Sequence, residues 1–109
     1  MNKIKNPEIE KHLVVSTIHI SKEDSDLLDF AIRNPISKVG MYLSLDRYDY
    51  GYRVFVGTEK AYIDKKSLID IGFSKEFYIL LKIAYDLKCK FLCLDGDGTV
   101  YKELKKFDW

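Results

Sequence analysis

Two amphipathic segments, each preceded by a serine, constrain the fold of this chain more than any other feature. Ser21 and Ser74 favour helix N-termini, because a serine hydroxyl accepts a hydrogen bond from a backbone N–H of the first turn. After Ser21, apolar residues recur at helical spacing as far as Asn34-Pro35, where the residue before proline avoids helical geometry. After Ser74, the same spacing continues to Leu87. The sequence therefore predicts two helices whose apolar faces need a common partner, which a sheet can supply.

Four segments around these helices predict the strands of that sheet. Residues 12–20 are rich in β-branched side chains, residues 41–46 alternate apolar and polar side chains, and residues 52–57 and 91–94 are short apolar runs. Between the second and third segments, Gly51 can adopt the positive φ of a hairpin loop. The order βαββαβ predicts a ferredoxin-like α+β fold, with an antiparallel four-stranded sheet and both helices on one face. A small mixed α/β sheet, in which the last strand takes another place, is the alternative.

Composition limits the classes of protein that this chain can represent. Its 109 residues are 47% hydrophobic, enough for one small domain, which we place at residues 12–109 after a polar, loosely ordered segment of residues 1–11. A formal net charge of +1 argues against a nucleic-acid partner. No apolar run approaches the roughly 20 residues of a membrane helix, and the first residues lack an apolar signal core. We therefore expect a cytoplasmic protein that does not contact a membrane.

The two cysteines and two histidines do not form a metal-binding pattern. Cys89 and Cys93 are interpreted as small hydrophobic residues in a reducing compartment, not as a disulfide. His12 and His19 are seven residues apart on one predicted strand, so their side chains would lie on opposite faces. We expect no cofactor. A homodimer is compatible with the exposed strand edge of so small a domain.

Residues 91–100, FLCLDGDGTV, form an apolar strand that runs into D-x-D-G-T. This stretch resembles the first motif of the haloacid-dehalogenase-like phosphatases, which implies Asp95 as nucleophile and Asp97 as general acid/base. Phosphoryl transfer also needs carboxylates for Mg²⁺ and a cation for the phosphate. The residues that follow Asp95 are too few for the further strands that carry these groups in that family. We therefore expect a turn, since Asp and Gly dominate tight turns, and keep a metal-dependent, phosphatase-like enzyme using Asp95 and Asp97 as an alternative.

The enzyme alternative depends on strand direction. In the antiparallel ferredoxin-like order, Asp95 would lie near His12 and about 20 Å from His19, at about 3.3 Å per residue. If the first and last strands were parallel instead, Asp95 and His19 would lie at the same edge of the sheet, where α/β proteins build their sites.

The predicted hairpin between the second and third strands is rich in tyrosine. In the ferredoxin-like order it shares an edge of the sheet with His19. Tyrosine and arginine provide large, stiff contacts and are enriched in binding hot spots. A hairpin that packs on itself, or one that binds a small ligand, remains open as an interpretation. We predict a protein-binding surface made of Arg47, Tyr48, Asp49, Tyr50, Tyr52 and His19.

The same hairpin offers a second alternative, RNA or DNA binding on the sheet face. The letters YGYRVFV resemble the second signature of the RNA-recognition motif, whose aromatic residues stack on bases. Here Tyr50 replaces the basic residue and Val54 stands where an aromatic residue belongs. Residues 12–20 contain no Phe, Tyr or Trp. These departures, together with the low net charge, argue against a nucleic-acid partner.

Three stretches together resemble one uncharacterised bacterial family, a domain of unknown function met on plasmids and other mobile elements. They are VSTIHI at residues 15–20, YGYRVFV at residues 50–56, and FLCLDGDG followed by a terminal FDW. The family pattern has S-T-A-H-I, then Y-G-W, then L-L-L-D-x-D-G and a closing Y-D-W. This chain departs from it at Ile18, Tyr52 and Phe107. The matching positions are Ser16, Thr17, His19, Ile20, Tyr50, Gly51, Asp95, Asp97, Gly98, Asp108 and Trp109.

This resemblance implies no established activity. It links the DGDG turn to Trp109, which would fold back on the sheet edge, with Asp97 as an anchor. The mobile-element setting implies an accessory protein that inhibits a host defence system by binding one of its components. We therefore expect a small non-enzymatic protein whose partner is a host or phage-defence protein.

Overall fold

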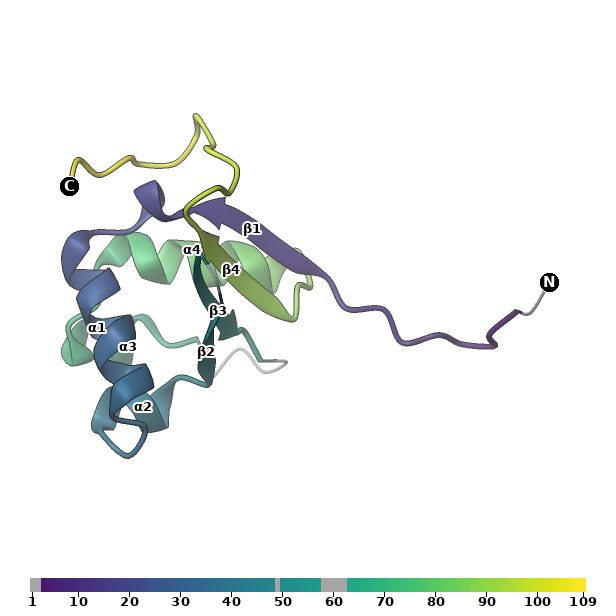
Figure 1. Ribbon diagram of the computed structural model, residues 1–109, viewed down its shortest axis with the longest axis horizontal. Helices are drawn as coiled ribbons and strands as arrows, with labels where there is room; N and C mark the ends of the chain where they lie inside the picture. Colours follow the sequence, from purple (N-terminus) through teal and green to yellow (C-terminus); the bar gives the residue numbers. More distant parts are fainter. Residues whose placement is uncertain (1–2, 49, 58–62) are drawn as a thin grey trace.

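The computed structural model describes residues 3–48, 50–57 and 63–109. Residues 3–9 extend away from the body of the molecule, and the remaining described residues form a single α+β unit around one sheet (Figure 1). The elements, in chain order, are β1 (His12–Ser16), a 3-10 turn η1 (Thr17–His19), α1 (Lys22–Arg33), α2 (Lys38–Tyr42), β2 (Leu45–Tyr48), β3 (Gly51–Phe55), α3 (Lys65–Ile71), α4 (Lys75–Asp86) and β4 (Phe91–Asp95).

The sheet is mixed, and the predicted ferredoxin-like antiparallel sheet is wrong. Its strand order is β1-β4-β3-β2; β1 and β4 are parallel, whereas β3 is antiparallel to both of its neighbours (Figure 1). β4 lies between β1 and β3. Three consecutive residues of β4, Leu92, Cys93 and Leu94, are buried, as expected for an apolar strand in this inner position. β1, whose His12 and Val14 are exposed, takes the edge. The predicted α+β class is therefore confirmed, while the sheet is mixed, as the alternative has it.

The two long helices begin where the sequence predicts them. Ser21 caps α1 in a capping box with Asp24, and the hydroxyl of Ser74 accepts a hydrogen bond from Phe77 N at the start of α4. α2 was not expected: Ser37 caps it, so part of the alternating segment at residues 41–46 closes a short helix instead of continuing a strand. The first strand also ends early, because the Ser16 hydroxyl accepts a hydrogen bond from Ile18 N and starts the 3-10 turn.

Both long helices contribute to one core on one face of the sheet. Alternate strand residues Val15, Tyr52, Val54, Leu92 and Leu94 are buried there and pack with residues of α1 and α4 in a single cluster. The residues between them lie on the other face, which we call the open face. The open face consists of His12, Val14, Asp46, Arg53, Phe55, Phe91 and Cys93.

A buried carboxylate joins the N-termini of the two long helices. Asp24 is fully buried, and its side chain accepts hydrogen bonds from Ser21 N at 3.1 Å, Ser74 N at 2.8 Å and Ser74 Oγ at 2.6 Å. A buried carboxylate is tolerated only when such donors surround it. Asp24 therefore sets the position of α4 relative to α1.

We expect Asp24→Ala to lower the free energy of unfolding by about 3 kcal/mol, because Ser21 and Ser74 would lose a charged acceptor in a buried site. Urea denaturation followed by circular dichroism measures this change. Asp26→Ala is the matched control, since Asp26 lies in the same helix and forms an exposed pair with Lys22. Equal stability losses in the two variants would contradict a structural role for Asp24.

Candidate protein-binding rim

Three stretches that are far apart in the sequence meet at one end of the sheet. The last residues of β1 and β4, Ser16 and Asp95, are register partners, and Asp95 also pairs with Gly51, the first residue of β3. The carbonyl of Tyr50 accepts a hydrogen bond from Gly96 N at 2.8 Å. We call this end of the sheet the rim and define it as residues 16–20, 50–52, 95–98 and 107–109.

Two glycines allow the backbones of the rim to approach one another. A Cβ atom at Gly51 would lie 1.7 Å from the carbonyl oxygen of Leu94, and one at Gly98 would lie 2.7 Å from that of Val15. Neither oxygen can move without disturbing the strand to which it belongs. These contacts require residues without a side chain, which gives a physical reason for glycine at both positions.

The DGDG stretch forms a turn, as the sequence predicts. The carboxylate of Asp95 accepts a hydrogen bond from Asp97 N at 2.8 Å, and Gly98 N donates to the carbonyl of Asp95 at 2.8 Å. Within the described residues, no group of three His, Cys, Asp or Glu side chains could hold a metal ion. The geometry of Asp95 and Asp97 is therefore explained by the turn itself.

His19 lies below the surface of the rim and holds the C-terminal segment. Its side chain is 1% exposed. Tyr101 N donates to Nε2 at 2.9 Å, and Nδ1 lies 2.8 Å from the carbonyl of Lys105. Because an amide N–H can only donate, Nε2 is the acceptor and Nδ1 carries the proton. The parallel strands do bring His19 and Asp95 to the same end of the sheet, but both ring nitrogens of His19 are engaged by backbone groups.

The C-terminal segment returns across the end of β1 and the 3-10 turn (Figure 1). Ser16 N donates to the carbonyl of Thr99 at 2.8 Å, and Phe107 N donates to that of Ile18 at 2.8 Å. The indole Nε1 of Trp109 donates to the carbonyl of Ile20 at 2.9 Å, so the side chain folds back on the domain, as expected from the sequence resemblance. Trp109 thereby becomes part of the rim.

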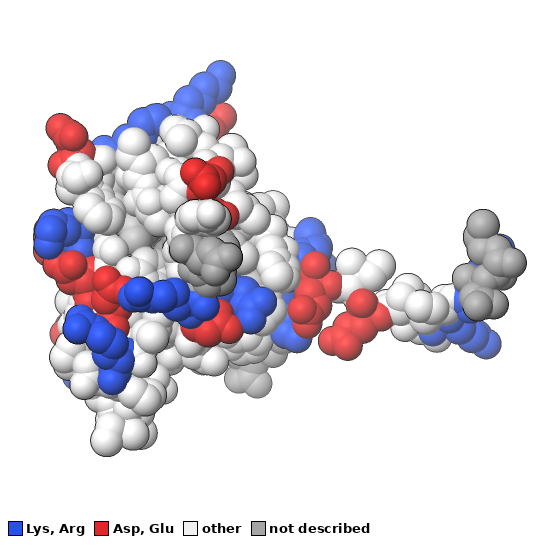
Figure 2. All heavy atoms as spheres, in the orientation of Figure 1, with Lys and Arg blue, Asp and Glu red and all other residues white. Residues whose placement is uncertain are grey.

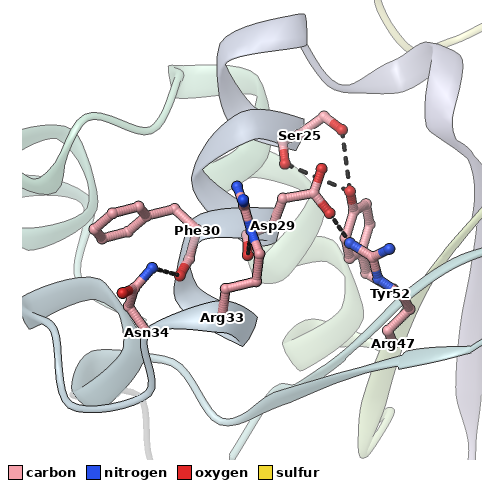
Figure 3. Close-up of polar contacts among 7 residues, drawn as sticks. All are labelled: Ser25, Asp29, Phe30, Arg33, Asn34, Arg47 and Tyr52. Carbon is pink, nitrogen blue, oxygen red and sulfur yellow. Dashed lines mark hydrogen bonds and ion pairs between the residues drawn. The ribbon is translucent and has the colours of Figure 1, made fainter.

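A polar network ties the β2–β3 hairpin to α1 (Figure 3). Arg47 forms an ion pair with Asp29 and lies over the ring of Tyr52, 5.8 Å from its centroid. The hydroxyl oxygen of Tyr52 lies 3.3 Å from Ser25 Oγ and 3.5 Å from the Ser25 carbonyl oxygen. Burial raises the pKa of Tyr52, so its hydroxyl stays protonated at neutral pH. The network places Arg47 and Tyr52 side by side at the edge of the rim.

A hollow of about 250 Å³ lies at the rim. Two exposed aromatic side chains border it: Tyr50 is 66% exposed and Trp109 is 57% exposed. A larger hollow of about 570 Å³ lies at the opposite end of the sheet beside Phe55 and Lys90, away from the residues of the family pattern. The rim hollow is lined by Thr17, Ser25, Arg47, Tyr50, Gly51, Tyr52 and Trp109.

The structure brings together part of the surface that the sequence predicts. Arg47, Tyr50 and Tyr52 line one hollow, and His19 supports the rim from below. Tyr48 ends β2, and Asp49 lies outside the described residues. Sequence reasoning did not assign Trp109, Thr17 or Ser25 to this surface. Trp109 and Thr17 are among the residues on which the sequence resemblance rests, whereas no sequence signal marks Ser25, which reaches the hollow from α1.

We expect His19→Leu to release the C-terminal segment, because Tyr101 N and the Lys105 carbonyl lose their buried partner. The cost is about 2 kcal/mol, and hydrogen exchange at Tyr101 and beyond should become faster. His12→Leu, a change of the exposed histidine, should leave this exchange unchanged. Unaltered protection of residues 101–109 in His19→Leu would contradict the proposed anchor.

We expect Gly51→Ala to destabilise the fold by more than about 2 kcal/mol, because the new methyl group would overlap the carbonyl of Leu94. Gly96→Ala is the control, since its Cβ would lie 3.4 Å from the Tyr50 carbonyl. Thermal unfolding of both variants distinguishes the two sites. Equal melting temperatures would show that β3 and β4 need no close approach at Gly51.

One family model matches the chain, and it covers residues 12–109. No curated protein and no solved structure shows a significant match. Among the described residues, no helix is long and apolar enough to cross a membrane. The matched region includes β1 through the C-terminal segment, and thus every part of the rim. The chain therefore belongs to the family of unknown function DUF5983, of which residues 12–109 are the C-terminal domain.

Proposed function

We propose that this protein is a small non-enzymatic binding module that docks a protein partner on the rim. One observation carries the proposal: Tyr50 and Trp109, both more than half exposed, border the same hollow. Large aromatic side chains beside a pocket are typical of binding hot spots.

The two aromatic residues are held in place before any partner arrives. The backbone of Tyr50 is bound to Gly96, and the next residue, Gly51, is packed against β4. The indole of Trp109 is oriented by its hydrogen bond to Ile20. Because the backbone of Tyr50 and the indole of Trp109 are already held, binding has fewer groups to order and costs less conformational entropy.

The lining of the hollow favours an uncharged side chain of the partner. Arg47 is neutralised by Asp29, and the hydroxyl groups of Thr17, Ser25 and Tyr52 offer donors and acceptors. A partner residue that combines an apolar body with a hydroxyl or amide group suits this surface. In the mobile-element setting that the sequence resemblance implies, the partner is a component of a host defence system, and the protein acts as its inhibitor.

The contacts of His19 and Asp95 support a non-enzymatic function. His19 uses both ring nitrogens to bind backbone groups, and Asp95 uses its carboxylate to close its own turn. A general base needs an available nitrogen or oxygen within reach of a substrate. His19 offers no such nitrogen in this geometry, and Oδ1 of Asp95 is already engaged in the turn.

The charge distribution supports a protein partner over a nucleic acid. On the open face, Arg53 pairs with Asp46, and Lys90 beside it pairs with Glu10. Figure 2 shows acidic and basic side chains interleaved across α1 and the adjoining sheet. Among the described residues on the side of the molecule that the figure shows, no large area has one sign of charge. Such a surface attracts a phosphate backbone weakly.

We expect the double variant Tyr50→Ala/Trp109→Ala to lose the partner that tagged wild-type protein recovers from a bacterial host lysate. Titration calorimetry with that purified partner should then show at least about a 30-fold weaker Kd, equivalent to about 2 kcal/mol. Ile36→Ala/Met41→Ala is the matched control, because it truncates two exposed apolar side chains outside the rim. If the control weakens binding and the rim variant does not, another surface binds the partner.

A further inference from the structure

Cys93 occupies the middle of the open face. It lies in the inner strand β4, with Val14 of β1 and Arg53 of β3 as its register partners on either side. Cys93 is 6% exposed, yet it is not part of the core cluster, to which Cys89 belongs. Its burial therefore comes from neighbouring side chains on the open face, and its sulfur lies on the solvent side of the sheet.

A histidine lies within proton-transfer distance of this sulfur. Nδ1 of His12 is 3.5 Å from Sγ of Cys93. The imidazole packs against the ring of Phe91, with 5.1 Å between centroids, and this contact directs it along the strand towards Cys93. His12 itself is exposed, so it can exchange protons with solvent. A thiol beside an imidazole is the arrangement by which proteins generate a thiolate.

A guanidinium group lies on the other side of the sulfur. Arg53 stacks over Phe91, 4.8 Å from the ring centroid, and binds Asp46 through two hydrogen bonds of 3.2 and 2.8 Å. The Asp46 carboxylate raises the pKa of Arg53, and the Cys93 sulfur adds to this effect. The Lys90–Glu10 pair adds one further charge of each sign near Phe91. In the cross-strand row, Arg53 lies next to Cys93 and Asp46 lies beyond Arg53, so the sulfur is nearer to the cation of this pair.

We propose that Cys93 is a modification site, a thiol that reacts with hydroperoxides, with His12 as its proton acceptor and Arg53 as the cation that stabilises the anionic sulfur. A neighbouring imidazole and a neighbouring cation both favour the thiolate form of a cysteine. Hydrogen peroxide is small enough to reach a sulfur that is only slightly exposed.

The reaction balances without a cofactor. His12 takes the thiol proton, and the thiolate attacks the terminal oxygen of the hydroperoxide. The O–O bond breaks as the S–O bond forms, and the leaving alkoxide or hydroxide takes the proton back from His12. Sulfur is oxidised to sulfenic acid, and the hydroperoxide is reduced to an alcohol or to water. A small thiol such as glutathione can then reduce the sulfenic acid through a mixed disulfide.

The two cysteines of the chain allow the site to be tested within one protein. Cys89→Ala leaves Cys93 as the one cysteine, and Cys93→Ala leaves Cys89, which belongs to the core cluster and is 7% exposed. Each variant, confirmed as folded by circular dichroism, is treated with hydrogen peroxide in the presence of dimedone, which traps sulfenic acid. Intact-mass spectrometry should show one dimedone adduct on Cys89→Ala and none on Cys93→Ala. Adducts on both variants, or on neither, would overturn the proposal.

A second measurement tests the role of His12, with iodoacetamide as the probe and the rate of alkylation recorded against pH. In Cys89→Ala, the half-maximal rate should fall below the pH of about 8.5 that is typical of a free cysteine. Adding His12→Gln, a change at an exposed position, should raise this midpoint. The rate at pH 7 should drop by about threefold for each unit of that rise, because the smaller thiolate fraction is partly offset by higher nucleophilicity. Identical pH profiles with and without His12 would overturn its assignment as the proton acceptor.

Discussion

The parallel pairing of β1 with β4 decides where the distinctive side chains of this protein lie. Because the two strands run in the same direction, both end at the rim, and the segments that follow them are brought together there. β3 begins at the same end, since it is antiparallel to β4, and Gly51 lets it approach the Leu94 carbonyl closely. An antiparallel β1–β4 pair would have placed the 3-10 turn and the DGDG turn at opposite ends of the sheet.

Buried polar contacts make this arrangement rigid. Asp24 joins the starts of α1 and α4, and His19 binds the backbone of the C-terminal segment at two points. Buried hydrogen bonds of this kind are costly to break, because each broken bond leaves an unsatisfied group away from water. The His19 contacts hold the C-terminal segment against the domain, and Trp109 at the end of this segment depends on them for its place at the rim. A partner that binds Tyr50 and Trp109 therefore meets a Tyr50 backbone and a Trp109 indole that are already held in place.

The rim and the Cys93 site are different parts of the molecule, so each can be changed without removing the other. The rim lies at one end of the sheet and acts through aromatic side chains that remain chemically unchanged. The Cys93 site lies in the middle of the open face and depends on a change in the oxidation state of sulfur. Because β4 contributes to both, through Asp95 at its end and Cys93 within it, oxidation at Cys93 takes place on a strand that also builds the rim.

The sequence by itself determined the two long helices and the turn after β4. Serine caps and helical periodicity located α1 and α4, and the Asp-Gly composition of residues 95–98 identified a turn, because these signals depend on neighbours within a few residues. The short helix α2 was missed because its apolar spacing also fits a strand. Strand order and direction were decided only by the tertiary structure, since they depend on which strand can be buried on both faces and paired on both edges. The contacts of Ser25 with the hairpin and of His12 with Cys93 likewise join residues whose proximity only the packed sheet creates.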